Sequence, residues 1–285
     1  MDTYREFDPT GHSLPQRLAR WTGCCAVAAC LLTLSCHVTP KNSSFDISSS
    51  DASALLLEMS SDPVELERPV VVVAGYLDPS LGSWWLASRF ANYTGDDRFL
   101  SVGSLSGNFD DARTRLIEAV DARWPSDSTS WTAEVDVIGI SMGGLLTRYA
   151  AAPSSDFEGD GPPRRRLRVR RLFSLSSPHR GARFAQLPCF LQLHRDMRSD
   201  SEFIRRLNEA DADRDYDVIP YVRLGDLTVG AENAAPPGQL PYWVSDRWFQ
   251  PAHVGAVLDA RIHADIARQL RGEERLSSPV ASRLP

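Results

Sequence analysis

Cysteine is scarce over most of this chain, because four of its five cysteines lie within the first forty residues and only Cys189 follows them. That distribution excludes a disulfide framework and a CxxC metal pair from the main part of the chain. Positive charge is also in short supply, since the formal net charge is -6 at pH 7. Without a basic surface for phosphate groups, nucleic acid is not expected as a partner.

The composition is that of an ordinary folded protein. The 285 residues are 42% hydrophobic and 24% charged, which is enough apolar material to bury the core of one domain and is unlike the composition of disordered chains. No internal repeat is visible along the sequence. A single domain of catalytic size is therefore expected.

The N-terminal segment, residues 1–36, has the layout of an export signal. Arg17 and Arg20 adjoin the apolar stretch within "LARWTGCCAVAACLLTLSC", which ends in small residues. This order of positive region, apolar region and small residue is typical of secretory signals. The apolar part, about 18 residues long, is marginal for spanning a bilayer. We expect export to the cell envelope. The alternative interpretations of this segment are a plain signal that is cleaved and an anchor that is not cleaved.

The end of this segment, "LTLSC", resembles the lipobox of bacterial lipoproteins. The resemblance implies that Cys36 would be lipidated and that the protein would associate with a membrane through its N-terminus. Residues 37–62 are polar and rich in serine, which predicts a flexible tether. The folded domain is then expected over residues 63–285.

Within that domain, short β-branched runs alternate with longer amphipathic stretches, a pattern that predicts a parallel sheet covered by helices on both faces. Asn108 is a candidate N-cap for a helix that carries Leu116 and Val120 on one face. A second helix is expected near the end of the chain, in "LDARIHADIARQL". The predicted strands are Arg68–Gly75, Arg98–Gly103, Ala133–Gly139, Arg170–Ser176 and Val218–Gly225.

The stretch "VDVIGISMGGLLTRYAA" places Ser141 between Gly139 and Gly143, where a predicted strand gives way to a predicted helix. A G-x-S-x-G match alone is weak, but this strand-to-helix context is that of a nucleophile elbow. Such a turn lifts the serine hydroxyl above the carboxyl edge of the sheet, where ligands bind in open α/β folds. Ser141 is therefore the candidate nucleophile.

A nucleophilic serine needs a base and an acid, which follow it in the order acid then histidine in this type of fold. Asp226 comes directly after the predicted strand Val218–Gly225, and Asp246 is its rival. His253 lies in a loop before the final helix and is preferred as the base over His263, which lies inside that helix. His179 precedes the acid and is expected to line or shape the site, not to act as the base.

Cleavage of an ester creates an oxyanion that two backbone amides must receive. The residue after the nucleophile, Met142, supplies one candidate donor. The other comes from the loop after the first strand, where Tyr76 is the candidate and Leu77 is the alternative.

Five segments of the sequence together resemble the α/β-hydrolase superfamily, in particular its bacterial lipases and esterases. They are "VVVVAGYLD", "GISMGGLLTRYAA", "LSSPHRGARFA", "GDLTV" and "HVGAVLDARIHADIARQL". The resemblance covers about Arg68 to Leu270 and implies a serine hydrolase that acts on esters. It maps the catalytic roles onto Ser141, Asp226 and His253, with Tyr76 and Met142 as oxyanion donors, and implies neither a cofactor nor a metal ion. Many members carry His-Gly where this chain has Ala74 and Gly75.

Residues 181–216 form an insertion that is too long for a simple connection. Its apolar residues predict either a lid over the site or a helix that covers the core, and both readings stay open. The expected activity is that of a lipase or carboxylesterase on acyl lipids or medium-chain esters. A thioesterase, acyltransferase or lipid deacylase of the same fold is the alternative, and a non-catalytic binding protein anchored in the envelope is a third hypothesis.

Overall fold

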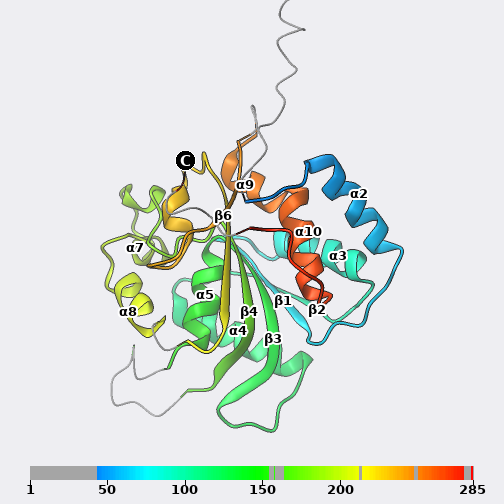
Figure 1. Cartoon of the computed structure of the whole chain (residues 1–285). Helices are drawn as coiled ribbons and strands as arrows, with labels where there is room; N and C mark the ends of the chain where they lie inside the picture. The colour runs from blue at the N-terminus through cyan, green and yellow to red at the C-terminus, as the bar shows by residue number, and fades with distance from the viewer. Residues whose placement is uncertain are drawn as a thin grey trace, which may run out of the picture. The chain divides into compact units, whose positions relative to one another are not determined.

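The computed structural model describes residues 44–153, 157, 164–211, 214–246, 250–278 and 284. Within these ranges six strands form one sheet in the order β2-β1-β3-β4-β5-β6, and every neighbouring pair is parallel (Figure 1). The strands are β1 (Val70–Val73), β2 (Phe99–Val102), β3 (Trp131–Ile140), β4 (Arg166–Leu175), β5 (Asp217–Arg223) and β6 (Tyr242–Val244). All five predicted strands are present.

Two details of the sheet differ from the sequence-based expectation. The edge strand β6 was not predicted, because its three residues are too few for an alternating pattern to be recognised. Strand β4 begins at Arg166 instead of Arg170, since arginines occupy positions that a strand usually gives to β-branched residues. These arginines pair across the sheet, as Arg171 does with Asp136.

Helices cover both faces of the sheet (Figure 1). Helices α4, α5, α7 and α8 contribute to the core on one face, and α2, α3 and α10 contribute to the core on the other. Strand β1 shows how the two cores are divided, because Val71 and Val73 point into the first and Val70 and Val72 into the second. The helices are α2 (Ser49–Ser60), α3 (Leu81–Thr94), α4 (Phe109–Arg123), α5 (Met142–Ala151), α7 (Gln192–Asp196), α8 (Glu202–Ala210), α9 (Ala252–Val257) and α10 (Ala260–Leu270).

This arrangement confirms the predicted α/β-hydrolase fold, a mostly parallel central sheet between two helical layers. The predicted N-cap also holds, because the side chain of Asn108 accepts a hydrogen bond of 2.8 Å from the amide of Asp111. The sequence pattern located these elements correctly because each of them has a local periodicity.

The prediction of a flexible tether over residues 37–62 is wrong for its second half. Residues 49–60 form helix α2, whose N-cap Ser48 accepts a hydrogen bond of 3.1 Å from the amide of Asp51. Ala52, Leu56 and Met59 of this helix are buried. Their spacing of four and three residues makes one apolar stripe, which the surrounding serines obscured at the level of composition. The described fold therefore begins at residue 44, before the predicted boundary at 63.

The predictions for the N-terminal segment lie outside the described residues. They concern the export segment 1–36, the lipidation of Cys36 and the first part of the tether. In the ranges that the structure does describe, no helix has both the length and the hydropathy needed to cross a membrane.

The insertion at residues 181–216 divides into two parts with different positions. The first part contains a short 3-10 helix, Phe184–Gln186, and helix α7. The second part is α8, whose Ile204 and Leu207 are buried in the core next to α4 and α5. The second part therefore fits the core-covering helix, whereas the first part lies beside the site described below.

Candidate active site

Ser141 occupies a sharp turn between strand β3 and helix α5. Its backbone has φ 50° and ψ -120°, a conformation that a residue with a side chain rarely adopts. A hydrogen bond of 2.8 Å from the Ser141 amide to the carbonyl of Leu175 ties the turn to β4. The strained turn places the serine at the carboxyl edge of the sheet, as the elbow pattern predicted.

Three glycines allow this turn to pack closely against its neighbours. A Cβ atom on Gly139 would lie 2.7 Å from the amide nitrogen of Gly144, and a Cβ on Gly143 would collide with the carbonyl oxygen of Val73. A Cβ on Gly144 would collide with the hydroxyl of Ser177. The sequence analysis singled out Gly139 and Gly143 and missed Gly144, although it follows directly in the chain.

The structure brings Ser141, His253 and Asp226 together in one hydrogen-bonded chain. The Nε2 atom of His253 lies 3.1 Å from the Oγ atom of Ser141, and its Nδ1 atom lies 2.9 Å from Oδ2 of Asp226. The three side chains come from different places: the turn after β3, the first turn of α9 and the loop after β5. This is the order of contacts that a hydroxyl, an imidazole and a carboxylate need for proton transfer. The prediction that His253 lies in a loop is wrong, because residues 252–257 form the short helix α9.

Asp226 is buried and strongly held. Its Oδ1 atom accepts hydrogen bonds of 3.0 Å from the amides of Thr228 and Val229. Burial on its own raises the pKa of this carboxyl, but the hydrogen bond and charge of His253, with the amide of Val229 and the hydroxyl of Ser176, lower the pKa below its usual value. Asp226 is therefore ionised and oriented toward His253 near neutral pH.

The rival residues lie elsewhere. Asp246 accepts a hydrogen bond of 2.8 Å from the amide of Gly225, so it holds the loop that leads to Asp226. His263 is buried in α10, and its Nε2 atom donates to the carbonyl of Val257 at 2.7 Å. Both therefore have structural partners away from Ser141.

His179 does not line the site, which was one of the two roles expected for it. It is fully buried between Ser174 and Arg148, with Nε2 at 2.6 Å from the Ser174 hydroxyl and Nδ1 at 3.1 Å from Arg148. Burial and the nearby charge of Arg148 hold the pKa of His179 well below its usual value. His179 does not line the pocket at Ser141 and instead braces α5 from within the core.

The two candidate oxyanion donors flank the nucleophile. A Cβ atom on Gly75 would lie 3.4 Å from the Cβ of Ser141, so the loop that carries Tyr76 runs against the elbow. Met142 opens helix α5 directly after Ser141. Neither the Tyr76 amide nor the Met142 amide donates a hydrogen bond to another group within the described ranges.

A pocket of about 390 Å³ opens at Ser141 and His253. Its wall is mainly apolar, and among the described residues that line it Asp78 is the only acidic one. The carboxylate of Asp78 accepts hydrogen bonds from the amides of Ser80 and Gly82, so it also shapes the start of α3. The other described lining residues, beside Ser141 and His253, are Gly75, Tyr76, Gly82, Ile140, Phe184, Thr228, Val254 and Val257. Such a pocket suits an apolar group.

Four tryptophans are close in sequence to the segments that form the site, and the structure describes three of them. Trp84 is exposed in the first turn of α3, close in sequence to Gly82. Trp85 packs beside His263 on α10, and Trp243 is buried on β6. Trp248 lies outside the described residues.

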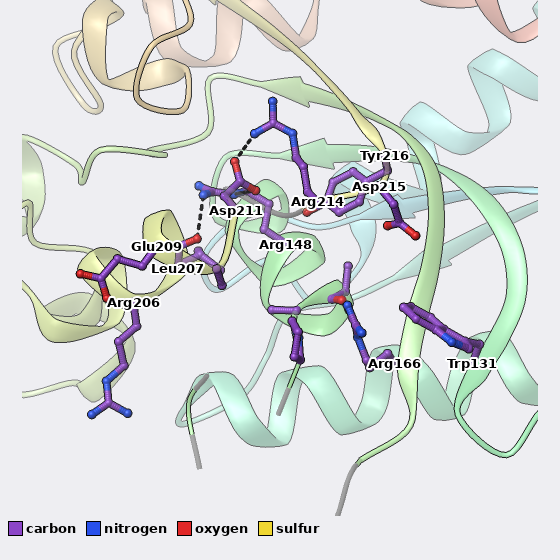
Figure 2. Close-up of a pocket in the computed structure, with 14 residues that line it drawn as sticks. Trp131, Arg148, Arg166, Arg206, Leu207, Glu209, Asp211, Arg214, Asp215 and Tyr216 are labelled. Atoms are coloured by element: carbon purple, nitrogen blue, oxygen red, sulfur yellow. Dashed lines mark hydrogen bonds and ion pairs between the residues drawn. The ribbon is translucent and has the colours of Figure 1, made fainter. Parts of the chain in front are cut away.

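A second pocket, of about 500 Å³, lies at the opposite end of the sheet. Figure 2 shows Trp131 and Arg166, the first residues of β3 and β4, on its wall, together with Arg148 and Arg214, which both reach Asp211. Ser141, Asp226 and His253 are not among its lining residues. This pocket is therefore separate from the candidate active site.

Metal ligands are not grouped in the described residues. No set of three or more His, Cys, Asp or Glu side chains within them is placed to hold a metal ion.

Comparisons with known proteins give a likeness of fold. No family model matches the chain, and no curated protein matches it. One similar solved structure is a protein of Lactobacillus plantarum WCFS1 that was proposed to be a cell surface hydrolase. It shares 15% identity, the match covers 74% of this chain and 94% of that chain, and the TM-score is 0.42.

Proposed function

We propose that the protein is a serine hydrolase that cleaves carboxylic esters through an acyl-enzyme. The observation that carries this proposal is the hydrogen-bonded chain from Ser141 through His253 to Asp226 at a strained strand-to-helix turn. A serine hydroxyl is a weak nucleophile unless a base removes its proton. Here the base, its orienting carboxylate and an apolar pocket meet at the same hydroxyl.

In the first step, Ser141 Oγ attacks the ester carbonyl carbon while Nε2 of His253 takes its proton. Asp226 holds the Nδ1 hydrogen and stabilises the imidazolium that forms. The proton on Nε2 then passes to the leaving alkoxide, which departs as the alcohol. In the second step, water attacks the acyl-serine, gives one proton to His253 and releases the carboxylic acid, and His253 returns the proton to Ser141.

The negative charge on the carbonyl oxygen needs donors that are already in place. The amides of Met142 and Tyr76 are assigned this role, because one follows the nucleophile and the other lies on the loop that contacts it. Each such donor contributes about 3 kcal/mol to lowering the barrier.

The substrate is assigned as an ester with an apolar acyl group, of medium chain length or longer, because the pocket wall is mainly apolar. A thioester or acyl-transfer reaction would use the same acyl-enzyme and differ in the group that leaves or accepts. Export and lipidation of Cys36 remain part of the proposal, since the segment "LTLSC" supports them.

The proposal is tested by incubating the full-length protein with a fluorophosphonate probe and with p-nitrophenyl esters of increasing chain length. Wild-type protein is expected to be labelled and to hydrolyse the esters, whereas Ser141→Ala does neither. The matched control is Ser177→Ala, which removes a buried hydroxyl near the elbow that does not bond to His253. A wild-type protein inert toward both reagents would support the non-catalytic binding protein instead.

Lipidation is tested separately by metabolic labelling with an alkyne fatty acid. The label is expected in the wild type and absent in Cys36→Ala. Equal labelling of the two proteins would remove Cys36 as the anchor.

A further inference from the structure

Most of the large apolar side chains that are exposed in the described residues belong to chain segments around the pocket at Ser141. Val254 lines the pocket itself, and four others directly adjoin lining residues in the chain, as Leu77 follows Tyr76. Three more lie on the segment that follows Phe184. We name this set the apolar collar: Leu77, Leu81, Leu187, Phe190, Leu191, Leu227, Val254 and Leu258.

The exposure of the collar is large. Phe190 is 98% exposed and Leu227 is 78% exposed. Isolated apolar residues on a protein surface are ordinary, but a concentration of them around one opening marks an interaction site.

Contacts within the fold hold two segments of the collar, those of Leu187 and Leu77. Nε2 of His194 donates to the carbonyl of Leu187 at 3.1 Å, and the His194 ring packs 4.9 Å from the ring of Phe184. Leu77 has φ 59°, in the left-handed region that is costly for a leucine, and a hydrogen bond from the Asp78 amide to Gly75 closes this turn. The collar is thus built into the fold next to the pocket.

The beginning of the described chain points to what covers this surface. Ser44 accepts a hydrogen bond from the amide of Trp243 on β6, and β6 pairs with the last residues of β5, which lead to Asp226. Seven residues, 37–43, separate Ser44 from Cys36. Eight residue steps of extended chain, at most about 29 Å, therefore join Cys36 to Ser44 at the carboxyl half of the sheet.

We propose that the apolar collar rests on a lipid bilayer, so that the pocket at Ser141 opens onto the acyl chains of membrane lipid. This inference rests on the proposed ester hydrolysis and names where its substrate lies. The attraction is apolar and not electrostatic, because no collar residue is basic and the chain carries a net charge of -6. Docking is therefore insensitive to salt and does not require anionic lipid.

The first experiment uses full-length protein reconstituted in phosphatidylcholine vesicles. It compares hydrolysis of a long-chain 4-methylumbelliferyl ester carried in the bilayer with hydrolysis of water-soluble p-nitrophenyl butyrate. In the double variant Phe190→Asp with Leu81→Asp, the ratio of the two rates is expected to fall at least tenfold. Leu57→Asp is the matched control, because Leu57 is 72% exposed on α2 and lies outside the collar. An unchanged ratio in the double variant overturns the inference.

The second experiment does not depend on catalysis and is done in Ser141→Ala. Trp84 is 63% exposed one helical turn after Leu81, so brominated phosphatidylcholine is expected to quench it. Trp84→Phe should remove that part of the quenching, at low and at high salt. Equal quenching with and without Trp84 overturns the docking proposal. Because quenching does not need catalysis, this result separates a failure of the docking from a failure of the proposed function. Collar-dependent dimers in buffer, without quenching by lipid, would assign the surface to a second copy of the chain.

Discussion

The Nε2 atom of His253 lies 3.1 Å from the Oγ atom of Ser141, although 112 positions separate the two residues in the chain. Their contact depends on two elements that are far apart in the chain, the elbow after β3 and the short helix α9. Close packing of glycines fixes the elbow. Helix α9 packs against the buried side chain of Arg223, which bonds Gln250 and Asp259. The predictions that follow test the triad, the support of α9 and the stability of the surrounding fold.

Asp226→Asn is expected to lower the turnover number by about 10⁴-fold, because the amide no longer fixes the tautomer of His253 or stabilises its charged form. Turnover of p-nitrophenyl esters measures the effect. Asp246→Asn is the control and should retain turnover, since Asp246 bonds the amide of Gly225 instead. Full activity in Asp226→Asn would show that another residue acts as the acid of the triad.

Arg223→Met is expected to lower kcat by about 10²-fold with a smaller change in KM, because a small misplacement of the base slows the chemistry. Arg223 is buried at the end of β5 and donates to Gln250 at 2.6 Å and to Asp259 at 3.2 Å, on either side of α9. A Cβ atom on Gly255 of α9 would collide with its guanidinium. The arginine thus supports the helix that carries His253.

The control for Arg223 is Arg261→Met. Arg261 also bonds Asp259, at 2.9 and 3.0 Å, but lies beyond α9. Both variants should lose about 3 kcal/mol in the free energy of unfolding, measured with urea, because each breaks a buried ion pair. Only Arg223→Met should lose kcat, and equal losses of kcat in the two variants would contradict a positioning role.

The free energy of unfolding is expected to decrease as the pH falls from 6.5 to 4. Burial lowers the pKa of His263 to about 4 from its ordinary value of 6.5. Between these values the unfolded chain binds a proton at this residue and the folded chain does not, so His263 alone accounts for a loss of about 3 kcal/mol. Urea unfolding at a series of pH values measures this slope.

His263→Gln keeps a hydrogen-bond donor for the carbonyl of Val257 but does not titrate. The pH slope should therefore be shallower in this variant by the contribution of His263. The buried His179, whose pKa is also lowered, contributes in the same direction in both proteins. The same slope in the variant and the wild type would show that His263 is not the group responsible.

Leu56→Ala is expected to destabilise the protein by about 3 kcal/mol, because Leu56 is buried under α2 and its removal leaves a cavity. Leu57→Ala is the neighbouring control and should change stability by less than about 0.5 kcal/mol, since Leu57 is exposed. Urea unfolding of the two variants decides whether residues 49–60 belong to the folded domain. A similar small effect in both variants would show that residues 49–60 belong to a flexible tether and not to the folded domain.

Several features of the site follow from local sequence. The run from Val137 to Leu146 contains a strand, a turn that needs glycine and the start of a helix, so the elbow was predictable. Asp226 could be proposed as the acid because it directly follows a strand, and a parallel sheet carries its site at the carboxyl ends of its strands. The buried stripe of α2 was present in the sequence too, but a composition rich in serine concealed it.

Other features are not encoded in any local pattern. The contact of His253 with Ser141 depends on the packing of α9 against Arg223. The choice between Asp226 and Asp246 depends on which of the two carboxylates faces His253. The placement of His179 inside the core and the gathering of the apolar collar around one opening arise from packing between distant segments. Local sequence determined the strands, the helices α4, α5 and α10 and the nucleophile, because short-range periodicity and backbone sterics fix them. Tertiary structure decided the base, its acid and the surface of the site, because these depend on contacts between residues far apart in the chain.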